Sequence, residues 1–353
     1  MRVLIAGQGL AGTAVAWRLR EMGHDFLIID PCEETTSSIV AAGLMTPITG
    51  KDLTPSWRFK TFYKQAVEFY RKLEKTLGSH LFYPTAISRI FINQSEKDTF
   101  NQAFEQDEFR QHVEQLDKFP KYVSAPHGGF TMPSGGRVNV KEIIKQSRNY
   151  FSQYDQFRKG FFDLDKVLPY KNHFVFEGEK FDRIVLCRGF RESNYMDHKA
   201  LQFEPNRGQM LRVKTEQFVN DPVWNQRGLW SFREPERGSV LIGATYNRMQ
   251  TSAHPSVTSF EQIIRRLRRY MELPNGSFKI INHPTGIRPI IRGWKLVAGA
   301  HPRINNLYLF NGLGSKGALR APTFSLQLVN QIINGEQIDA GVDFGMVNNK
   351  QSY

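Results

Sequence analysis

A glycine fingerprint set between a strand and a helix constrains this chain more than any other feature. The apolar residues 3–6 predict a buried parallel strand, and Gly7-Gln8-Gly9-Leu10-Ala11-Gly12 follows them at once. Apolar residues then recur at helical spacing up to Met22, and residues 26–29 predict a second strand. In such a unit the three glycines permit a tight turn, close approach of a pyrophosphate, and packing of helix on strand. The sequence therefore predicts an α/β, Rossmann-like dinucleotide-binding fold.

An acidic residue, Asp30, ends the second predicted strand. It follows the fingerprint at close to the roughly 20-residue spacing at which a carboxylate binds the ribose hydroxyls of adenosine. A carboxylate at this position disfavours a 2′-phosphate. The fingerprint and Asp30 together do not distinguish FAD from NAD.

Length and composition indicate an ordinary globular protein. The 353 residues are enough for two domains, and no apolar run approaches the roughly 18 residues that a membrane span requires. Two cysteines, Cys32 and Cys187, are too few for a disulfide framework, and the histidines lack zinc-ligand spacing. We therefore expect a cytoplasmic protein without a metal site or integral membrane association. The net charge of +13 favours an anionic partner, whether nucleic acid, membrane surface or acidic substrate.

Several further segments resemble one family, the FAD-dependent oxidoreductases of the D-amino-acid oxidase and glycine oxidase type. The matching segments are residues 37–44, 183–189, Arg207-Gly208-Gln209, Gly286-Ile287-Arg288-Pro289 and 311–318. Two departures stand out. Cys187 and Arg188 replace the usual small residues of a strand-ending turn, and residues 292–296 differ from the stretch that follows the Arg-Pro pair in many relatives.

The resemblance implies a Rossmann-like FAD-binding domain interleaved with a smaller, mixed-sheet α+β substrate domain. Residues 1–80, 134–203 and 285–353 would form the first, and residues 81–133 and 204–284 the second. The sequence pattern predicts helices over residues 57–77, 138–150 and 259–273, and an exposed helical segment over residues 93–118.

The resemblance also implies which residues hold noncovalent FAD. The C-terminal region lacks the cysteine to which some relatives attach the cofactor, and no second GxGxxG is present for a nicotinamide, so we expect electrons to come from an organic substrate. Lys316 would stabilise negative charge at the flavin N1/C2=O edge, although a loop lysine is as often solvated. The expected cofactor-binding residues are Gly7, Gly9, Leu10, Ala11, Gly12, Asp30, Ser38, Ala42, Gly43, Phe162, Gly189, Gly312, Leu313, Gly314, Ser315, Lys316 and Gly317.

Arg288 is the expected substrate-binding residue. In the family, the arginine of Gly-x-Arg-Pro holds the carboxylate of an amino acid, and a guanidinium fork suits that planar anion. The alternative is an arginine paired with a core acid. Tyr246 is a candidate second contact through its phenol.

The expected reaction is oxidation of a C–N bond in a small amino acid or N-substituted amine, with hydride transfer to flavin N5.

Two alternatives to this reaction remain. The closing motif, residues 312–317 with Ala321-Pro322, is similar to the oxidoreductase domain of a bifunctional tRNA-modifying enzyme that removes a carboxymethyl group from a wobble uridine. A non-catalytic flavin-binding protein is the other alternative. The basic run 265–269 could contact RNA, but the sequence does not show basic residues gathered on one surface, so the free amine ranks first. The electron acceptor, oxidase against dehydrogenase activity, and oligomeric state stay open.

Overall fold

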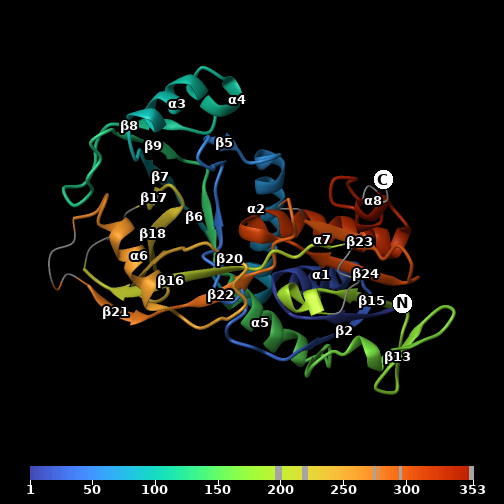
Figure 1. Ribbon diagram of the computed structural model, residues 1–353. Coiled ribbons are helices and arrows are strands. Elements are labelled where there is room, and N and C mark those ends of the chain that lie inside the picture. The colour runs from blue at the N-terminus through green and yellow to red at the C-terminus, as the bar shows by residue number, and fades with distance from the viewer. Residues whose placement is uncertain (195–200, 217–221, 273–275, 277, 294–295, 350–353) are drawn as a thin grey trace.

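Two large sheets organise the protein. The computed structural model describes residues 1–194, 201–216, 222–272, 276, 278–293 and 296–349. Figure 1 shows a sheet of blue, yellow-green and red strands beside a second sheet of green, yellow and orange strands. Each sheet combines segments that are far apart in the sequence, so the chain crosses between them more than once.

The six-stranded sheet carries the N-terminal fingerprint. Its strands are parallel, except that the edge strand β23 is antiparallel to β24. Residues 3–6 of the central strand β1 are fully buried, as expected for a strand covered on both faces. In spatial order the strands are β11 (Phe157–Lys159), β2 (Asp25–Asp30), β1 (Arg2–Ala6), β15 (Arg183–Leu186), β24 (Leu307–Asn311) and β23 (Val297–Ala300).

Helices cover one face of this sheet, and a small sheet covers the other. The helices share one apolar core with β1 and β2, and Phe174, Phe176 and Phe181 of the small sheet share another with Leu4 and Leu27. The helices are α1 (Leu10–Glu21), α2 (Phe59–Leu77), α5 (Val140–Ser152) and α7 (Gly317–Asn334), and the short helix α8 (Phe344–Asn349) lies beside β23. The small sheet consists of β12 (Leu168–Pro169), β13 (Phe174–Phe176) and β14 (Glu179–Phe181).

The ten-stranded sheet is mixed, with one parallel pair, β7 and β17. The helix α6 (Val257–Leu267) packs on one face, and α3 (Gln94–Phe104) and α4 (Asp107–Arg110) contribute phenylalanines to the core on the other. The strands are β20 (Asn247–Arg248), β16 (Asn206–Lys214), β19 (Ser239–Gly243), β18 (Leu229–Glu234), β17 (Val223–Gln226), β7 (Ile87–Ile90), β9 (Gly129–Met132) and β8 (Glu114–Leu116), with β21 (Lys279–Asn282) and β22 (Thr285–Arg288) also paired to β16.

Two short sheets lie between the large ones. They contain β3 (Leu44–Met45), β10 (Gly136–Val138) and β6 (Phe82–Pro84), and the pair β4 (Ile48–Thr49) and β5 (Thr54–Pro55). Sheet membership differs from the expected domain boundaries at two places. The strand β6 pairs with β10 of the expected cofactor domain, and β22 pairs with β16 of the expected substrate domain. The division into two interleaved domains remains our proposal.

Four predicted helices have different limits in the structure. The backbone of Arg58 has the left-handed conformation, so α2 begins at Phe59 and not at residue 57. The Asn139 side chain accepts from the Glu142 amide and caps α5, which leaves Val138 in a strand. The predicted helical segment 93–118 is wrong at its end, because residues 114–116 form β8. Similarly, α6 ends at Leu267 and not at residue 273, which lies outside the described residues.

Candidate functional site

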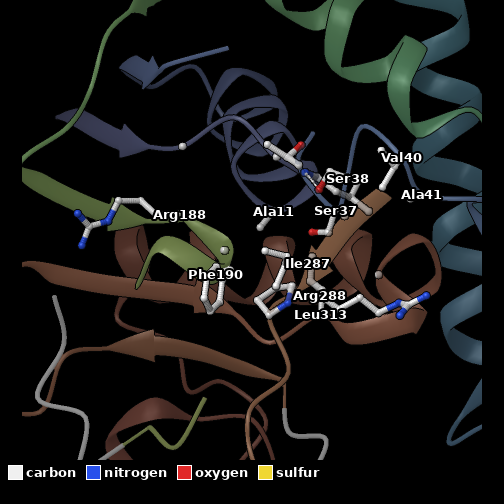
Figure 2. Close-up of a pocket in the computed structure, with 18 of the residues that line it drawn as sticks. Ala11, Ser37, Ser38, Val40, Ala41, Arg188, Phe190, Ile287, Arg288 and Leu313 are labelled. Atoms are coloured by element: carbon white, nitrogen blue, oxygen red, sulfur yellow. Dashed lines mark hydrogen bonds between the residues drawn. The ribbon is translucent and has the colours of Figure 1, made fainter. Parts of the chain in front are cut away.

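A cavity of about 850 Å³ lies between the two large sheets. It runs from the carboxyl ends of β1 and β2 to β16 and β22, and ligands bind at such strand ends in open α/β sheets. Figure 2 shows side chains from three regions around the same space, with Ala11, Ser37 and Ser38 above, Ile287, Arg288 and Leu313 below, and Phe190 to the left of the lower group. Segments far apart in the sequence thus build one site.

The glycine fingerprint forms one end of the cavity. Gly7 has a φ of +100°, and a Cβ there would lie 2.7 Å from the Cys187 carbonyl oxygen. A Cβ on Gly12 would collide with the Gly7 carbonyl oxygen, so this glycine packs helix on strand and does not line the cavity. Gly9 is the N-cap residue of α1 and has no side chain that could bond to the first helical amides. The first turn of α1 contains no acidic residue. This helix end can therefore accept a phosphate.

Asp30 is oriented by backbone donors beside the fingerprint. Its two carboxylate oxygens accept from the amides of Gln8 and Cys32, each at 2.7 Å. Arg148 from α5 lies 3.5 Å from the same carboxylate and also donates to the Gln8 side chain at 2.8 Å. Asp30 lines the cavity with further acceptor capacity, as a ribose-binding carboxylate requires.

Small residues form the wall between the two ends. Ser38 Oγ accepts from the Leu10 amide at 3.1 Å, which ties this loop to the first turn of α1. Ala42 and Gly43 line the cavity beside it. Opposite them, Asn311 donates to the Gly189 carbonyl oxygen at 2.9 Å and accepts from the Gly312 amide, which fixes the glycine turn before α7.

The unusual Arg188 is satisfied by a neighbour. Its Nε and Nη2 donate to the buried carboxylate of Glu192 at 3.0 and 2.7 Å, and the guanidinium carbon lies 5.5 Å from the Phe162 ring centre. The bulky side chain is thereby held by the η2 turn (Gly189–Asn194), while Phe162 and Gly189 remain cavity-lining residues. Of the other departing segment, Arg292 donates to the Gln202 side chain at the surface, and residues 294 and 295 lie outside the described residues.

Lys316 does not line the cavity, contrary to the expectation for this residue. Its ammonium donates to Thr49 and Ser56, both at 3.1 Å, on the β4–β5 hairpin. Burial, assisted by the charge of Arg320, lowers the pKa of Lys316 to about 8. The hairpin hydroxyls thus draw the side chain away from its neighbours Ser315 and Gly317, which do line the cavity. Gly312 is the other expected cofactor residue outside the lining, apart from Gly12.

Arg288 lies at the opposite end from Asp30 and presents a free side of its guanidinium. Nη1 donates to Asn206 Oδ1 at 3.2 Å and to the Thr245 carbonyl oxygen at 3.3 Å. In the described part of the chain, neither Nη2 nor Nε has a hydrogen-bond acceptor, and Arg288 pairs with no carboxylate. Burial lowers the pKa of Arg288, but a guanidinium stays charged in a protein. The alternative of an arginine neutralised by a core acid therefore finds no partner among these residues.

Tyr246 and Gly208 hold this guanidinium between them. The Tyr246 ring centre lies 4.3 Å from the guanidinium carbon, so Tyr246 contacts Arg288 through the face of its ring. The contact of its phenol with the substrate stays a prediction. A Cβ on Gly208 would approach the same carbon to 2.5 Å. Tyr246 is 49% exposed and also lines the cavity, which places the mouth of the cavity beside it.

The substrate end contains residues that the sequence did not single out. Met210 and Trp230 form an apolar wall, and Thr251 and Ala253 continue it toward the mouth. Alternation along a strand indicates which of its residues share a face, and Met210 shares one with Gly208 of the matched segment Arg207-Gly208-Gln209. Which face meets the cavity depends on long-range pairing, and Trp230 is paired in register with Gly243 and hence to Met210.

The residues present fit FAD. One end offers Asp30 and the start of α1, whose first turn carries no acid. The middle offers small residues, and the other end offers apolar side chains and a guanidinium. Cys187 lines the cavity, and burial raises the pKa of its thiol, so this thiol is a weak nucleophile. Among the described residues, no three His, Cys, Asp or Glu side chains gather so as to hold a metal ion. None of the helices in that part of the chain combines the length and apolar composition that crossing a bilayer requires.

Several solved structures share the fold. Glycine oxidase from Bacillus cereus superposes with a TM-score of 0.81 over 95% of this chain and 96% of its own, at 18% identity. Iminodiacetate oxidase from Chelativorans sp. BNC1 superposes with a TM-score of 0.78 over 96% of each chain, at 16% identity. These likenesses establish the α/β fold.

Curated relatives match at similar distance. The tRNA 5-methylaminomethyl-2-thiouridine biosynthesis bifunctional protein MnmC of Marinobacter nauticus is 21% identical over 94% of this chain and 55% of its own length. The protein of the same name from Shewanella amazonensis is 21% identical, with 56% of its length covered. The chain thus spans about half the length of the curated relatives it matches.

A family model assigns the chain as a whole. The model described as DAO, FAD dependent oxidoreductase, matches residues 2–330, which include the fingerprint, Arg288 and the glycine turn before α7. The chain belongs to this family of FAD-dependent oxidoreductases.

Proposed function

We propose that the protein oxidises the C–N bond of a small amine that carries a carboxylate. The observation that carries this proposal is the Arg288 guanidinium at the end of the cavity, with Nη2 and Nε free of acceptors and no acid beside it among the described residues. A carboxylate accepts two parallel hydrogen bonds from such a fork. Arg288 would thereby fix one end of the substrate, and the apolar wall of Met210 and Trp230 would exclude water from the other.

The cofactor residues follow from the same cavity. Gly7, Gly9 and the first turn of α1 would hold the pyrophosphate, and Asp30 the adenosine ribose. The turn at residues 313–315 and the first residue of α7 would face the flavin, held without a covalent bond. FAD, when bound, supplies a hydride acceptor for the carbon next to nitrogen.

The polypeptide's own part in the reaction is binding and orientation. At the Arg288 end, Tyr246 is the one titratable lining side chain that the described residues provide besides Arg288. The site therefore lacks a strong base, and we propose that the amine binds as the neutral species. The two-electron oxidation leaves an imine, which water hydrolyses to a carbonyl compound and a free amine.

A panel of amines tests this proposal. Glycine, N-methylglycine, proline, iminodiacetate and D-amino acids are mixed anaerobically with the holoprotein, and loss of the flavin absorbance is followed. We expect at least one of them to bleach the flavin. If none does, the free carboxylate amine is not the substrate.

A second candidate is oxidative removal of a carboxymethyl group from a modified tRNA wobble uridine. The observations that favour it are the two MnmC relatives and the exposed Tyr246 at the cavity mouth, which leaves room for a substrate that extends into solvent. A carboxymethylamine presents the same carboxylate to Arg288. Transfer RNA that carries the modified uridine joins the panel, and bleaching by this RNA alone would favour the second candidate over the first.

A further inference from the structure

Five arginines gather at one end of the ten-stranded sheet. We call Arg227, Arg265, Arg266, Arg268 and Arg269 the arginine rim. Arg227 lies in the turn between β17 and β18, and the other four lie at the end of α6. Arg266 Nη2 donates to the Arg227 carbonyl oxygen at 2.9 Å, which joins the two segments. In the described part of the chain, no carboxylate pairs with any of the five.

The arginine rim lies beside the mouth of the cavity. Strand register places Arg227 near Tyr246, because Trp230 pairs with Gly243 in antiparallel strands and the residues three before Trp230 and three after Gly243 therefore lie at the same end. The Tyr246 ring in turn contacts the Arg288 guanidinium at 4.3 Å. Figure 1 shows α6 against β16 and β18, and the opposite face of these strands contributes Met210 and Trp230 to the cavity, so the arginine rim reaches the mouth around the end of the sheet.

The fold alone does not account for this gathering. Arginines at the end of α6 interact favourably with the helix dipole, but Arg227 is on another element. Four of the five side chains are exposed, and their mutual repulsion is not relieved by acids. A small amine needs one cation for its carboxylate, and Arg288 supplies it. Additional cations beside a half-exposed aromatic ring are typical of sites for single-stranded nucleic acid, where phosphates meet arginines and bases stack on rings.

We propose that the arginine rim is a docking surface for the phosphate backbone of a single-stranded or looped RNA, which presents an RNA-linked amine to the cavity mouth. This inference rests on the second candidate function. The half-exposed Tyr246 provides a stacking surface at the point where the RNA would enter.

The test compares two double variants with equal loss of charge. The rim variant is Arg227→Gln/Arg269→Gln, and the matched control is Lys141→Gln/Lys145→Gln, two exposed lysines of α5 that make no ion pair with the described residues. Arg266 is retained because it holds the Arg227 segment. The probe is a fluorescently labelled, unmodified anticodon stem-loop RNA, and its binding to each holoprotein is followed by anisotropy over a range of salt concentrations.

We expect wild type and control to bind the stem-loop with the same salt dependence. In the rim variant, binding at low salt should weaken by about tenfold or more, and the slope of log K against log salt should fall by roughly 2, one for each lost phosphate contact. FAD content and reduction of the flavin by the best free amine should match wild type, because neither residue lines the cavity.

Three results would overturn the proposal. The proposal is wrong if the stem-loop fails to bind wild type at low salt, or if the two double variants lose the same affinity. It is also wrong if the rim variant loses binding to phosphatidylglycerol vesicles while its RNA binding is unchanged. Failure of the second candidate function gives a different pattern. If modified tRNA does not bleach the flavin but RNA binding still depends on the arginine rim, the docking surface stands and the proposed chemistry on tRNA does not.

Discussion

Removing the Arg288 guanidinium should abolish tight binding of carboxylates without removing FAD. Arg288 has two donor positions, Nη2 and Nε, free to face a carboxylate, and a charge-assisted hydrogen bond contributes about 1.5–3 kcal/mol. Water in the open cavity competes for the same donors, so we take about 3–4 kcal/mol for the pair. This corresponds to a loss of affinity of about 150- to 900-fold in Arg288→Ala.

Two further variants separate charge from geometry. Arg288→Lys keeps a point charge but lacks the fork, so it should restore part of the affinity and not all of it. Gly208→Ala keeps Arg288 but places a Cβ 2.5 Å from the guanidinium carbon, which must then shift by about 1 Å. A displacement of that size should cost about tenfold to a hundredfold in the rate of flavin reduction at low substrate concentration.

The assay is anaerobic stopped-flow reduction of the flavin over a range of substrate concentrations, with the carboxylate amine that reduces wild type fastest. Arg292→Ala serves as the matched control, because Arg292 is exposed and bonds to Gln202, away from the cavity. FAD content and melting temperature show whether each variant is folded, since Arg288→Ala also loses the bonds to Asn206 and Thr245. Unchanged half-saturation and rate in a folded Arg288→Ala would refute the assignment of Arg288.

Three other predictions concern the cofactor end and the hairpin. The purified protein should be yellow, and acid denaturation should release intact FAD into the supernatant. Burial raises the pKa of both the Cys187 and Cys32 thiols, so neither is a reactive thiolate that would bond covalently to the flavin. Flavin fluorescence that stays with the precipitated protein would contradict this. Asp30→Ala should weaken FAD binding by about tenfold or more, and Asp30→Asn less, as measured by titration of the apoprotein. Because the pKa of Lys316 is lowered to about 8, the unfolded chain binds more protons than the native one between about pH 8 and 10.5, so this residue's contribution to stability should rise with pH there. Denaturant titrations of Lys316→Met should lack that rise.

The cofactor half of the site could be predicted because its signals are local. The fingerprint, the helix after it and Asp30 occupy one short stretch, and their geometry follows from steric rules that any such stretch obeys. From this stretch, Gly7, Gly9, Leu10, Ala11 and Asp30 line the cavity, whereas Gln8 and Gly12 do not, and Gly12 packs helix on strand. The resemblance in the last quarter of the chain extended the prediction to Arg288, which does line the cavity.

The direction of long side chains could not be predicted in the same way. Lys316 follows a cavity-lining serine, yet its ammonium turns to Thr49 and Ser56 on a hairpin that is distant in the sequence. Similarly, the contact of Arg288 with the face of Tyr246 depends on the pairing of β16 with β20 and β22, which sets residues from three segments side by side. Such contacts are decided by strand register, and the sequence contains no local signal for it.

The same limit applies to the choice between a free amine and an RNA-linked one. From the sequence, the basic run 265–269 is a row of charges on a helix, and a row of that kind is usually only solvated. The structure ends α6 at Leu267 and joins Arg266 to the Arg227 turn, which lies at the same end of β18 and β19 as the half-exposed Tyr246. In our proposal the basic residues are gathered in the arginine rim at the mouth of the cavity, and phosphate recognition requires such a gathering on one surface. For this reason the salt dependence of RNA binding, and not the net charge of +13, tests whether the arginine rim docks RNA, while bleaching of the flavin by amines or by modified tRNA decides between the two substrates.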